Sequence, residues 1–187
     1  RLRSVDEYSP EGRHDCRPEY PTVVYSQILK KIYPDVPVIL GGIEASMRRL
    51  THYDYWQDKL RRCILCDSGA DMILYGSGTK SIIQVSKDIE SGLSTNDMHN
   101  IPQTVYLAKE GDIYGGIKED DIILHSHEEC LANKKAEAEN YRHIEEESNK
   151  IHAQRLLQQT GKVYAVVNPP YPTMTTEELD ASFDLPY

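Results

Sequence analysis

Apolar residues recur along the chain in two patterns, and each pattern predicts a different kind of element. Unbroken apolar runs within 37–41 and 70–75 are typical of strands buried on both faces of a parallel sheet. Apolar residues at helical spacing follow Pro21 and again follow Thr79, where Gly92 is suited to a left-handed helix cap. Strand, glycine turn and helix therefore predict the α/β fold class, as a partial Rossmann-like parallel sheet with flanking helices. The two helical spacings comprise Tyr25, Ile28, Leu29 and Ile32, and then Ile82, Ile83, Val85 and Ile89.

The two predicted strands set an expectation for how the first half of the chain is connected. We expect strands 37–41 and 71–75 to be adjacent and parallel, joined by a right-handed crossover through a helix near 54–65. After residue 100 the pattern changes, because 104–114 resembles a hairpin around a Glu-Gly-Asp turn and 122–124 is predicted to be another short strand.

The acidic segment that follows is predicted to be helical. Ser126 and Glu129 have the spacing of a capping box, and neither Pro nor Gly occurs from there to residue 160. A single helix of ~34 residues would be ~50 Å long, which exceeds the width of a small domain. We therefore expect a break near 148–149. A last strand is expected at 162–167, followed by an extended tail at 171–187. The predicted parts are an irregular arm at 1–20, an α/β domain at 21–124, an acidic helical segment at 125–161 and a strand with an extended linker at 162–187.

Charge and composition exclude several classes of protein. The net charge is −9, and the acidic excess lies in 63–187, which contains 10 Lys and Arg against 21 Asp and Glu. Such a surface argues against nucleic-acid binding, which depends on clustered cations. No run approaches the roughly 18 apolar residues of a membrane span, and the start of the chain lacks the apolar core of a signal peptide. Four cysteines are too few for a disulfide scaffold, so we expect a cytoplasmic location.

The stretch from 36 to 56 is the strongest candidate for a ligand site. Paired glycines after a buried strand let a ligand approach the main chain, while arginines bind carboxylate or phosphate and aromatic rings stack on planar groups. In this interpretation the polar and aromatic residues line one cleft at the carboxyl edge of the sheet. In the alternative, Arg48 and Arg49 are consumed by Asp54, Asp58 or the carbonyl groups of a helix end, and Trp56 is buried. The candidate residues are Gly41, Gly42, Glu44, Ser46, Arg48, Arg49, His52, Tyr53, Asp54 and Trp56.

Three other motifs are weaker candidates. Cys63 and Cys66 have the spacing of half a zinc site or of a redox pair, but they lie in an apolar stretch, where free cysteine packs as a small hydrophobe. His125, His127 and Cys130 have few other potential metal ligands near them in the sequence. The turn at 76–79, Gly-Ser-Gly-Thr, suits an anion but lacks the full dinucleotide fingerprint. We therefore expect no metal site in this chain.

The motif Gly-Gly-Ile-Glu-Ala-Ser-x-Arg-Arg, followed by His-Tyr-Asp-Tyr-Trp, resembles the YgiQ family of radical S-adenosylmethionine proteins. The resemblance is to the region that precedes their iron–sulfur domain, and it covers nearly the whole chain. Two departures are that the family usually has Gly-Met-Gly-Glu at 76–79 and has Ser and Leu in place of Cys63 and Cys66. The matching positions are Arg17-Pro18, Tyr25, Pro37 to Arg49, His52 to Trp56, Asp71 to Gly78, Asn168-Pro169-Pro170 and Leu185-Pro186-Tyr187.

This resemblance implies that a 4Fe–4S cluster and S-adenosylmethionine bind in the full-length protein, outside these residues. The cluster needs Cys-x3-Cys-x2-Cys, a spacing that the chain lacks, so we expect the fragment alone to hold no cofactor and to be inactive. The family also resembles cobalamin-binding Rossmann-like domains, but their Asp-x-His-x2-Gly motif is absent here, which leaves cobalamin an analogy. Family members carry further strands before this region, so 21–124 is expected to be the later half of a larger N-terminal domain.

Three functions are compatible with these observations. The first is a non-catalytic N-terminal domain of a radical S-adenosylmethionine protein, whose partner is its own catalytic domain rather than a nucleic acid or a membrane. The second is an autonomous module that binds a small anion or cofactor at 41–42, and the third is a scaffold that docks the catalytic core. An exposed sheet edge beside 37–41 would also favour a homo-oligomer.

Overall fold

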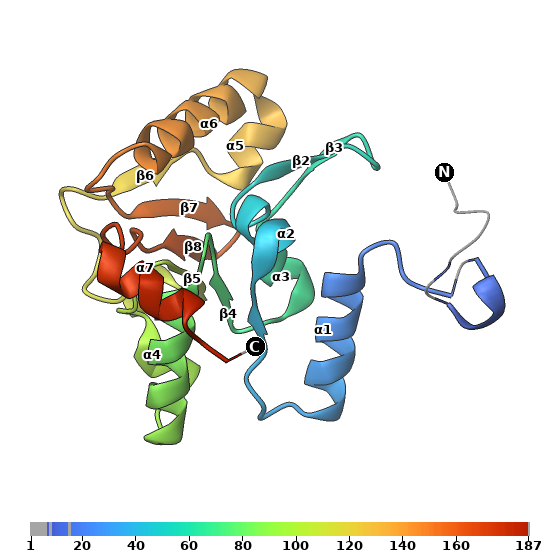
Figure 1. Ribbon diagram of the computed structural model, residues 1–187. Coiled ribbons are helices and arrows are strands. Elements are labelled where there is room, and N and C mark those ends of the chain that lie inside the picture. Colours follow the sequence, from blue (N-terminus) through green and yellow to red (C-terminus); the bar gives the residue numbers. More distant parts are fainter. Residues whose placement is uncertain (1–6, 8, 15, 187) are drawn as a thin grey trace.

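A six-stranded sheet forms the centre of the computed structural model, which describes residues 7, 9–14 and 16–186 (Figure 1). Its strands stand in the order β1-β4-β5-β8-β7-β6, and a separate hairpin, β2-β3, lies beside it. The strands are β1 (Ile39–Leu40), β2 (His52–Asp54), β3 (Lys59–Arg61), β4 (Met72–Leu74), β5 (Thr104–Ala108), β6 (Ile122–Leu124), β7 (Leu156–Thr160) and β8 (Val163–Val167).

Helices connect the strands and cover the sheet. The α-helices of the described residues are α1 (Pro21–Ile32), α2 (Gly42–Met47), α3 (Ile64–Ser68), α4 (Thr79–Glu90), α5 (His127–Ala132), α6 (Lys134–Ser148) and α7 (Thr176–Phe183). Short 3-10 helices are η1 (Pro10–Gly12), η2 (Thr95–Met98) and η3 (Glu110–Asp112). The predicted helix starts at Pro21 and Thr79 are confirmed, as is the left-handed conformation of Gly92, with φ +87°.

Successive residues of a strand enter different apolar layers, one on each face of the sheet. In β4, Ile73 packs in the layer that contains residues of α2 and α3, whereas Met72 and Leu74 pack in the layer that contains Val85 of α4. All three residues of β4 are buried. The unbroken apolar run of this strand therefore reflects burial on both faces, as its sequence predicts.

The expected parallel pairing of the first two sheet strands is confirmed. Strands β1 and β4 are adjacent and parallel, with Ile39 opposite Met72 and Leu40 opposite Ile73. The α/β class is confirmed too, but the sheet is mixed: β6-β7 is a second parallel pair, while β4-β5, β5-β8 and β7-β8 are antiparallel. One cause is the tight turn at 161–162 between β7 and β8, because a two-residue connection can join only antiparallel strands.

The predicted crossover helix near 54–65 is wrong. Residues 52–61 form the β2-β3 hairpin instead, and only the short helix α3 follows it. The carboxylate of Asp54 accepts hydrogen bonds from the backbone N–H groups of Trp56 and Gln57, at 2.9 and 3.2 Å. This local side-chain turn competes with helix formation, and the aromatic residues around it also favour a hairpin.

Two further expectations for the second half of the chain are wrong. Residues 104–114 are not a hairpin, because β5 pairs with β4 and β8 and then ends in η3. The segment 125–161 is helical only as far as Ser148, near the expected break, and it then supplies β7. Strand β7 was not predicted because its buried residue Gln158 is polar. The Gln158 side chain accepts a hydrogen bond from the N–H of Thr51 and donates one to the carbonyl oxygen of His125.

The outcomes at the two ends of the chain differ. The last strand expected at 162–167 is confirmed as β8, but the tail is not wholly extended, since α7 forms within it. A capping box of Thr175 and Glu178 begins α7, and this local signal was overlooked. In the N-terminal arm, residues 1–6, 8 and 15 lie outside the described part, and the remainder contains η1.

A buried ion pair fixes the start of the β6-β7 pair. Arg155 donates hydrogen bonds to both carboxylate oxygens of Asp121, at 2.9 and 2.5 Å, and to the carbonyl oxygens of Tyr114 and Gly116. The Arg155 and Asp121 side chains are 8% and 3% exposed. Burial alone would raise the pKa of Asp121, but the hydrogen bonds from Arg155 and from the Lys118 N–H outweigh it and lower that pKa.

Replacing Arg155 with Met should lower the free energy of unfolding at pH 7 by about 3–5 kcal/mol, because it leaves Asp121 buried without its cation. Since the folded pKa of Asp121 is depressed, the stabilisation is present above about pH 4 and is lost as the pH falls through the folded pKa. Urea denaturation of both proteins at several pH values measures this difference.

Arg142→Met is the matched control. Arg142 lies 3.8 Å from Glu146 on the exposed surface of α6, so its loss should change the stability by no more than about 0.5 kcal/mol. Equal losses in the two variants would show that the buried pair adds nothing beyond a surface contact.

Candidate functional site

Two glycine turns meet at one edge of the sheet because β1 and β4 are parallel. Gly41 and Gly42 follow β1 and lead into α2, and Gly42 has φ +80°. The turn after β4 leads into α4 through Gly76 and Gly78, with φ +66° and +64°. The positive φ values explain why glycine occupies these three positions. The sequence prediction that a glycine turn ends each strand is confirmed.

Ser46 on α2 ties the two turns together. Its hydroxyl donates a hydrogen bond to the carbonyl oxygen of Gly42 at 2.8 Å and accepts one from the N–H of Gly76 at 3.1 Å. The Gly76 N–H is thereby used within the protein. Ser46, which the sequence marked as a candidate ligand contact, therefore has a structural role in joining the two turns.

The two arginines of the motif have different surroundings. Arg48 forms an ion pair with Glu44 at 3.0 Å, and its guanidinium carbon lies 5.7 Å from the centre of the Tyr20 ring. Glu44 also accepts a hydrogen bond from Thr22 of α1 at 2.5 Å. Arg48 therefore joins α2 to the chain around α1, and its charge is already compensated by Glu44.

Arg49 is half-buried and has no carboxylate within ion-pair distance among the described residues. It donates a hydrogen bond to the carbonyl oxygen of Ser46, and its guanidinium carbon lies 5.1 Å from the centre of the Tyr75 ring. Its Nε is buried without a hydrogen-bond partner in the described part of the chain. Burial lowers the pKa of Arg49. Tyr75 and the more distant Glu145 act against this shift, and Arg49 lies beside the glycine turns without a contact ion pair among the described residues.

Asp54 is buried, and it organises the hairpin. Burial would raise its pKa, but the Tyr20 hydroxyl and the N–H groups of Gln57 and Trp56 lower it, so the group is ionised at neutral pH. Neither arginine of the motif forms an ion pair with Asp54 or Asp58, so that part of the alternative is wrong. Arg49 does donate to the Ser46 carbonyl oxygen in the last turn of α2, which is the helix-end contact that the alternative allowed.

The other polar residue of this group is His52, which is also held locally. Its Nδ1 lies 3.0 Å from the carbonyl oxygen of Leu50, and burial lowers the pKa of its imidazole. His52 is therefore neutral at pH 7, and its ring is oriented by its own backbone. This arrangement offers no cation for an anionic ligand.

The aromatic residues of the motif extend into solvent at the hairpin. Tyr53, Tyr55 and Trp56 are 57%, 77% and 73% exposed, and Tyr55 packs edge-to-face on Trp56 at 5.8 Å. The Tyr53 hydroxyl donates to Asp58 at 2.6 Å. The alternative that buries Trp56 is wrong. Among the described residues, no hydrogen bond or ion pair connects these three side chains with the glycine turns.

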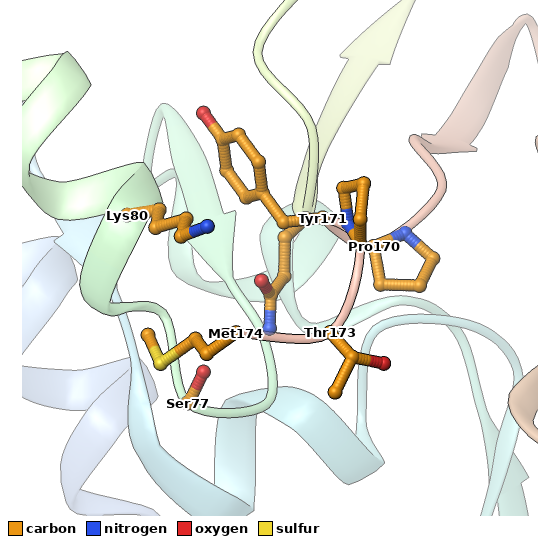
Figure 2. A pocket seen from close by; sticks show the side chains of 8 residues that line it. Ser77, Lys80, Pro170, Tyr171, Thr173 and Met174 are labelled. Atoms are coloured by element: carbon orange, nitrogen blue, oxygen red, sulfur yellow. The ribbon is translucent and has the colours of Figure 1, made fainter. Parts of the chain in front are cut away.

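A shallow cavity of about 150 Å³ lies beside the turn between β4 and α4 (Figure 2). Figure 2 shows Lys80 and Tyr171 on one side of the cavity and Met174 and Ser77 on another. The Lys80 ammonium donates to both carboxylate oxygens of Glu178, at 2.7 and 2.8 Å. Its charge is therefore compensated. The cavity is lined by Ser77, Lys80, Gln103, Pro170, Tyr171, Pro172, Thr173 and Met174.

This cavity was not predicted from the sequence. Five of its lining residues, 170–174, belong to the end of the chain, where an extended linker was expected. Asn168 anchors the tail: its amide donates to the carbonyl oxygens of His99 and Ile101 and to the Thr104 hydroxyl, at 2.9, 2.9 and 3.0 Å. The Tyr75 hydroxyl donates to the Asn168 carbonyl oxygen at 2.6 Å. The Asn-Pro-Pro motif was the signal, since its buried amide fixes where the chain leaves β8.

The cysteine pair is structural in its surroundings. Cys63 precedes α3 and is 1% exposed, whereas Cys66 is half-buried. A hydrogen bond between the two side chains, together with burial, raises the pKa of Cys63, while the same bond and the nearby Arg62 lower that of Cys66. In the described part of the chain, no group of three or more His, Cys, Asp or Glu residues could hold a metal ion.

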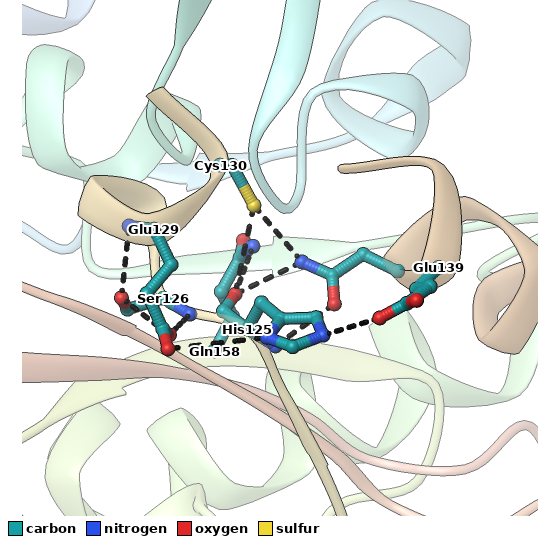
Figure 3. A network of polar contacts seen from close by, with 7 residues as sticks. His125, Ser126, Glu129, Cys130, Glu139 and Gln158 are labelled. Atoms are coloured by element: carbon teal, nitrogen blue, oxygen red, sulfur yellow. Dashed lines mark hydrogen bonds and ion pairs between the residues drawn. The ribbon is translucent and has the colours of Figure 1, made fainter. Parts of the chain in front are cut away.

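The His125 region forms a polar network that holds α5 and α6 against β7 (Figure 3). His125 Nε2 lies 2.7 Å from the Glu139 carboxylate, and the carbonyl oxygen of His125 accepts from Asn140 and Gln158 at 2.9 and 3.0 Å. His127 is directed elsewhere, with its Nδ1 3.0 Å from the Thr51 hydroxyl. The two histidines therefore have separate structural partners.

Comparison with known proteins places these features in a family. The family model "Radical SAM N-terminal" matches residues 1–187. The chain is 56% identical to a UPF0313 protein of Bacteroides thetaiotaomicron over 198 residues, which covers 100% of this chain and 32% of that protein. It is 51% identical to a UPF0313 protein of Porphyromonas gingivalis (100% and 29% covered) and 42% identical to one of Clostridium botulinum (99% and 28%).

No solved structure matches the chain. None of the helices in the described residues is long and apolar enough to cross a membrane. The chain spans 28 to 32% of the length of the three relatives named above. Because the family model covers the chain from its first residue to its last, this chain belongs to the Radical SAM N-terminal family.

Proposed function

We propose that this chain is the non-catalytic N-terminal domain of a cytoplasmic, YgiQ-type radical S-adenosylmethionine protein. The observation that carries the proposal is the family match over residues 1–187 in a chain that spans only 28 to 32% of its relatives. The 4Fe–4S cluster and S-adenosylmethionine would then bind to the remaining part of the full-length protein. The reaction and substrate belong to that part.

The cysteines of this chain do not fit the cluster. A 4Fe–4S cluster of this class needs three thiolates at Cys-x3-Cys-x2-Cys spacing, which is absent from the sequence. Cys130 is buried, and burial together with Glu137 raises the pKa of its thiol to about 12, so it is protonated at neutral pH. Cys63 is also buried, and its pKa is raised too. These properties support a structural role for the cysteines.

A second candidate function is the binding of a small anion at the two glycine turns. The observation that favours it is the half-buried guanidinium of Arg49, which has no carboxylate partner in the described residues and lies next to Ser46. Arginine is suited to such a ligand because its planar group forms paired hydrogen bonds with carboxylate or phosphate. The ligand contacts we propose are Arg49 and the backbone at Gly41 and Gly42.

The first proposal is tested by anaerobic reconstitution with iron and sulfide. The 187-residue chain should show no iron–sulfur absorbance and should form no 5′-deoxyadenosine from S-adenosylmethionine and a reductant, whereas the full-length protein should do both. A stoichiometric, EPR-active cluster in the 187-residue chain would overturn the proposal, because Cys63 and Cys66 would then have to be ligands.

The second candidate is tested by titrating inorganic phosphate into the chain and two single variants, with calorimetric detection. Arg49→Gln should weaken binding by about 2 kcal/mol, or roughly thirtyfold in Kd, because it removes a charge-assisted hydrogen bond. Arg48→Gln is the matched control, since Glu44 already compensates Arg48. Absence of phosphate binding to the parent chain, or equal weakening in both variants, would reject an anion site at Arg49.

A further inference from the structure

Helix α1 packs on the rest of the domain through Val23, which lies against the core, and through several polar side chains. Ser26, on the inward face, is 4% exposed, and α1 lies against α3. Three other polar side chains of α1, of which Gln27 is exposed, form hydrogen bonds to neighbouring elements. Thr22 donates to Glu44, Gln27 to the carbonyl oxygen of Asp67 at 2.7 Å, and Lys30 to both carboxylate oxygens of Asp71 at 3.1 and 2.9 Å.

The opposite face of α1 is apolar and exposed. This "α1 face" consists of Tyr25, Ile28, Leu29 and Ile32, which are 48%, 47%, 46% and 58% exposed. Tyr33 and Val36 continue it beyond the helix, at 57% and 54% exposure. A surface helix of a globular protein normally directs its apolar stripe to the core. In α1 only Val23 packs on the core, while the larger apolar residues face solvent, and an exposed apolar patch of this kind marks an interaction surface.

The position of α1 in the molecule agrees with such a surface. In Figure 1, α1 stands toward one margin of the molecule, next to α3, and of the described chain the N-terminal arm with η1 lies further out. The chain passes from the α1 face into β1, which is the edge strand of the sheet and has β4 as its one partner among the described strands. An unpaired strand edge is normally covered by another part of the protein. The same margin therefore has both an apolar helix face and an open sheet edge.

The lengths of the relatives show that most of the full-length protein is available to cover this margin. The chain corresponds to 28 to 32% of each of three relatives, so more than two thirds of those proteins lies outside the matched region. The family description, "Radical SAM N-terminal", agrees with the proposed position of this region before a radical S-adenosylmethionine domain. We propose that the radical S-adenosylmethionine domain of the same polypeptide packs on the α1 face. This inference rests on the proposed N-terminal-domain function and identifies its contact surface.

The inference is tested by thiol labelling of two single variants, Ile28→Cys and Ile82→Cys. Both isoleucines lie on 12-residue helices and are similarly exposed, at 47% and 45%, but Ile82 is on α4, away from the α1 face. Each variant is made in the 187-residue chain and in the full-length protein. Maleimide labelling is followed by mass spectrometry of the peptide that carries the new thiol, so that Cys16 does not interfere.

In the 187-residue chain both introduced thiols should react at similar rates. In the full-length protein the thiol from Ile28→Cys should react at least about tenfold more slowly, because labelling would require the domains to separate, while the thiol from Ile82→Cys should be unaffected. If both thiols react equally fast in the full-length protein, the inference is wrong. Protection of the Ile28→Cys thiol already in the 187-residue chain, with light scattering at dimer mass, would assign the α1 face to a second copy and also overturn the inference.

The result of the labelling experiment can be distinguished from the result of the test of the proposed function. A full-length protein that binds the cluster and cleaves S-adenosylmethionine, yet leaves the Ile28→Cys thiol reactive, would retain the proposed function and reject this docking surface. A full-length protein that protects the thiol but assembles no cluster would reject the proposed function instead.

Discussion

The parallel pairing of β1 and β4 is the constraint on which the candidate site depends. Parallel neighbours end at the same edge of a sheet, so the glycine turn after each strand is brought beside the other. Ser46 then bonds to both turns, and Arg49, three residues further on, bonds to the Ser46 carbonyl oxygen. Without this pairing, residues 41–49 and 76–78 would have no common location. The register of two short strands thus positions every group at this edge.

Buried polar side chains, rather than apolar packing alone, determine how the remaining segments attach to the sheet. Asn168 fixes the exit of the chain from β8, and Gln158 connects β7 to Thr51 and to the turn before α5. Arg155 holds Asp121 and two carbonyl oxygens at the start of β6. Each of these groups is satisfied, which is the condition under which burial of a polar side chain is tolerated. Such contacts specify one arrangement of loops that lack strong local preferences.

The residues of the motif between 41 and 56 make several different structural contacts. Its glycines and Ser46 shape the sheet edge, Glu44 and Arg48 connect α2 to α1 and Tyr20, and Asp54 stabilises the hairpin turn. Of its two arginines, Arg49 is the one without an ion pair among the described groups. The dense mixture of charged and aromatic residues that first suggested a ligand site is therefore accounted for largely by connections between elements.

Local patterns in the sequence were sufficient for the elements whose signals are local. Unbroken apolar runs identified β1, β4 and β8, Pro21 and helical spacing identified α1, and the glycines after β1 and β4 identified the turns. The family resemblance likewise depended on sequence motifs, and the match over 1–187 shows the family.

Tertiary structure decided what depends on distant partners. Strand β7 contains a polar residue, Gln158, whose burial is compensated by a hydrogen bond from Thr51, 107 positions away. The local pattern of apolar and polar residues therefore could not predict this strand. The apolar stripe of α1 predicted a helix correctly but not which face would be exposed, because that depends on the polar contacts its other side makes with Glu44, Asp67 and Asp71. A periodic pattern determines that a helix has two faces, and only the packed neighbours determine which of them meets solvent.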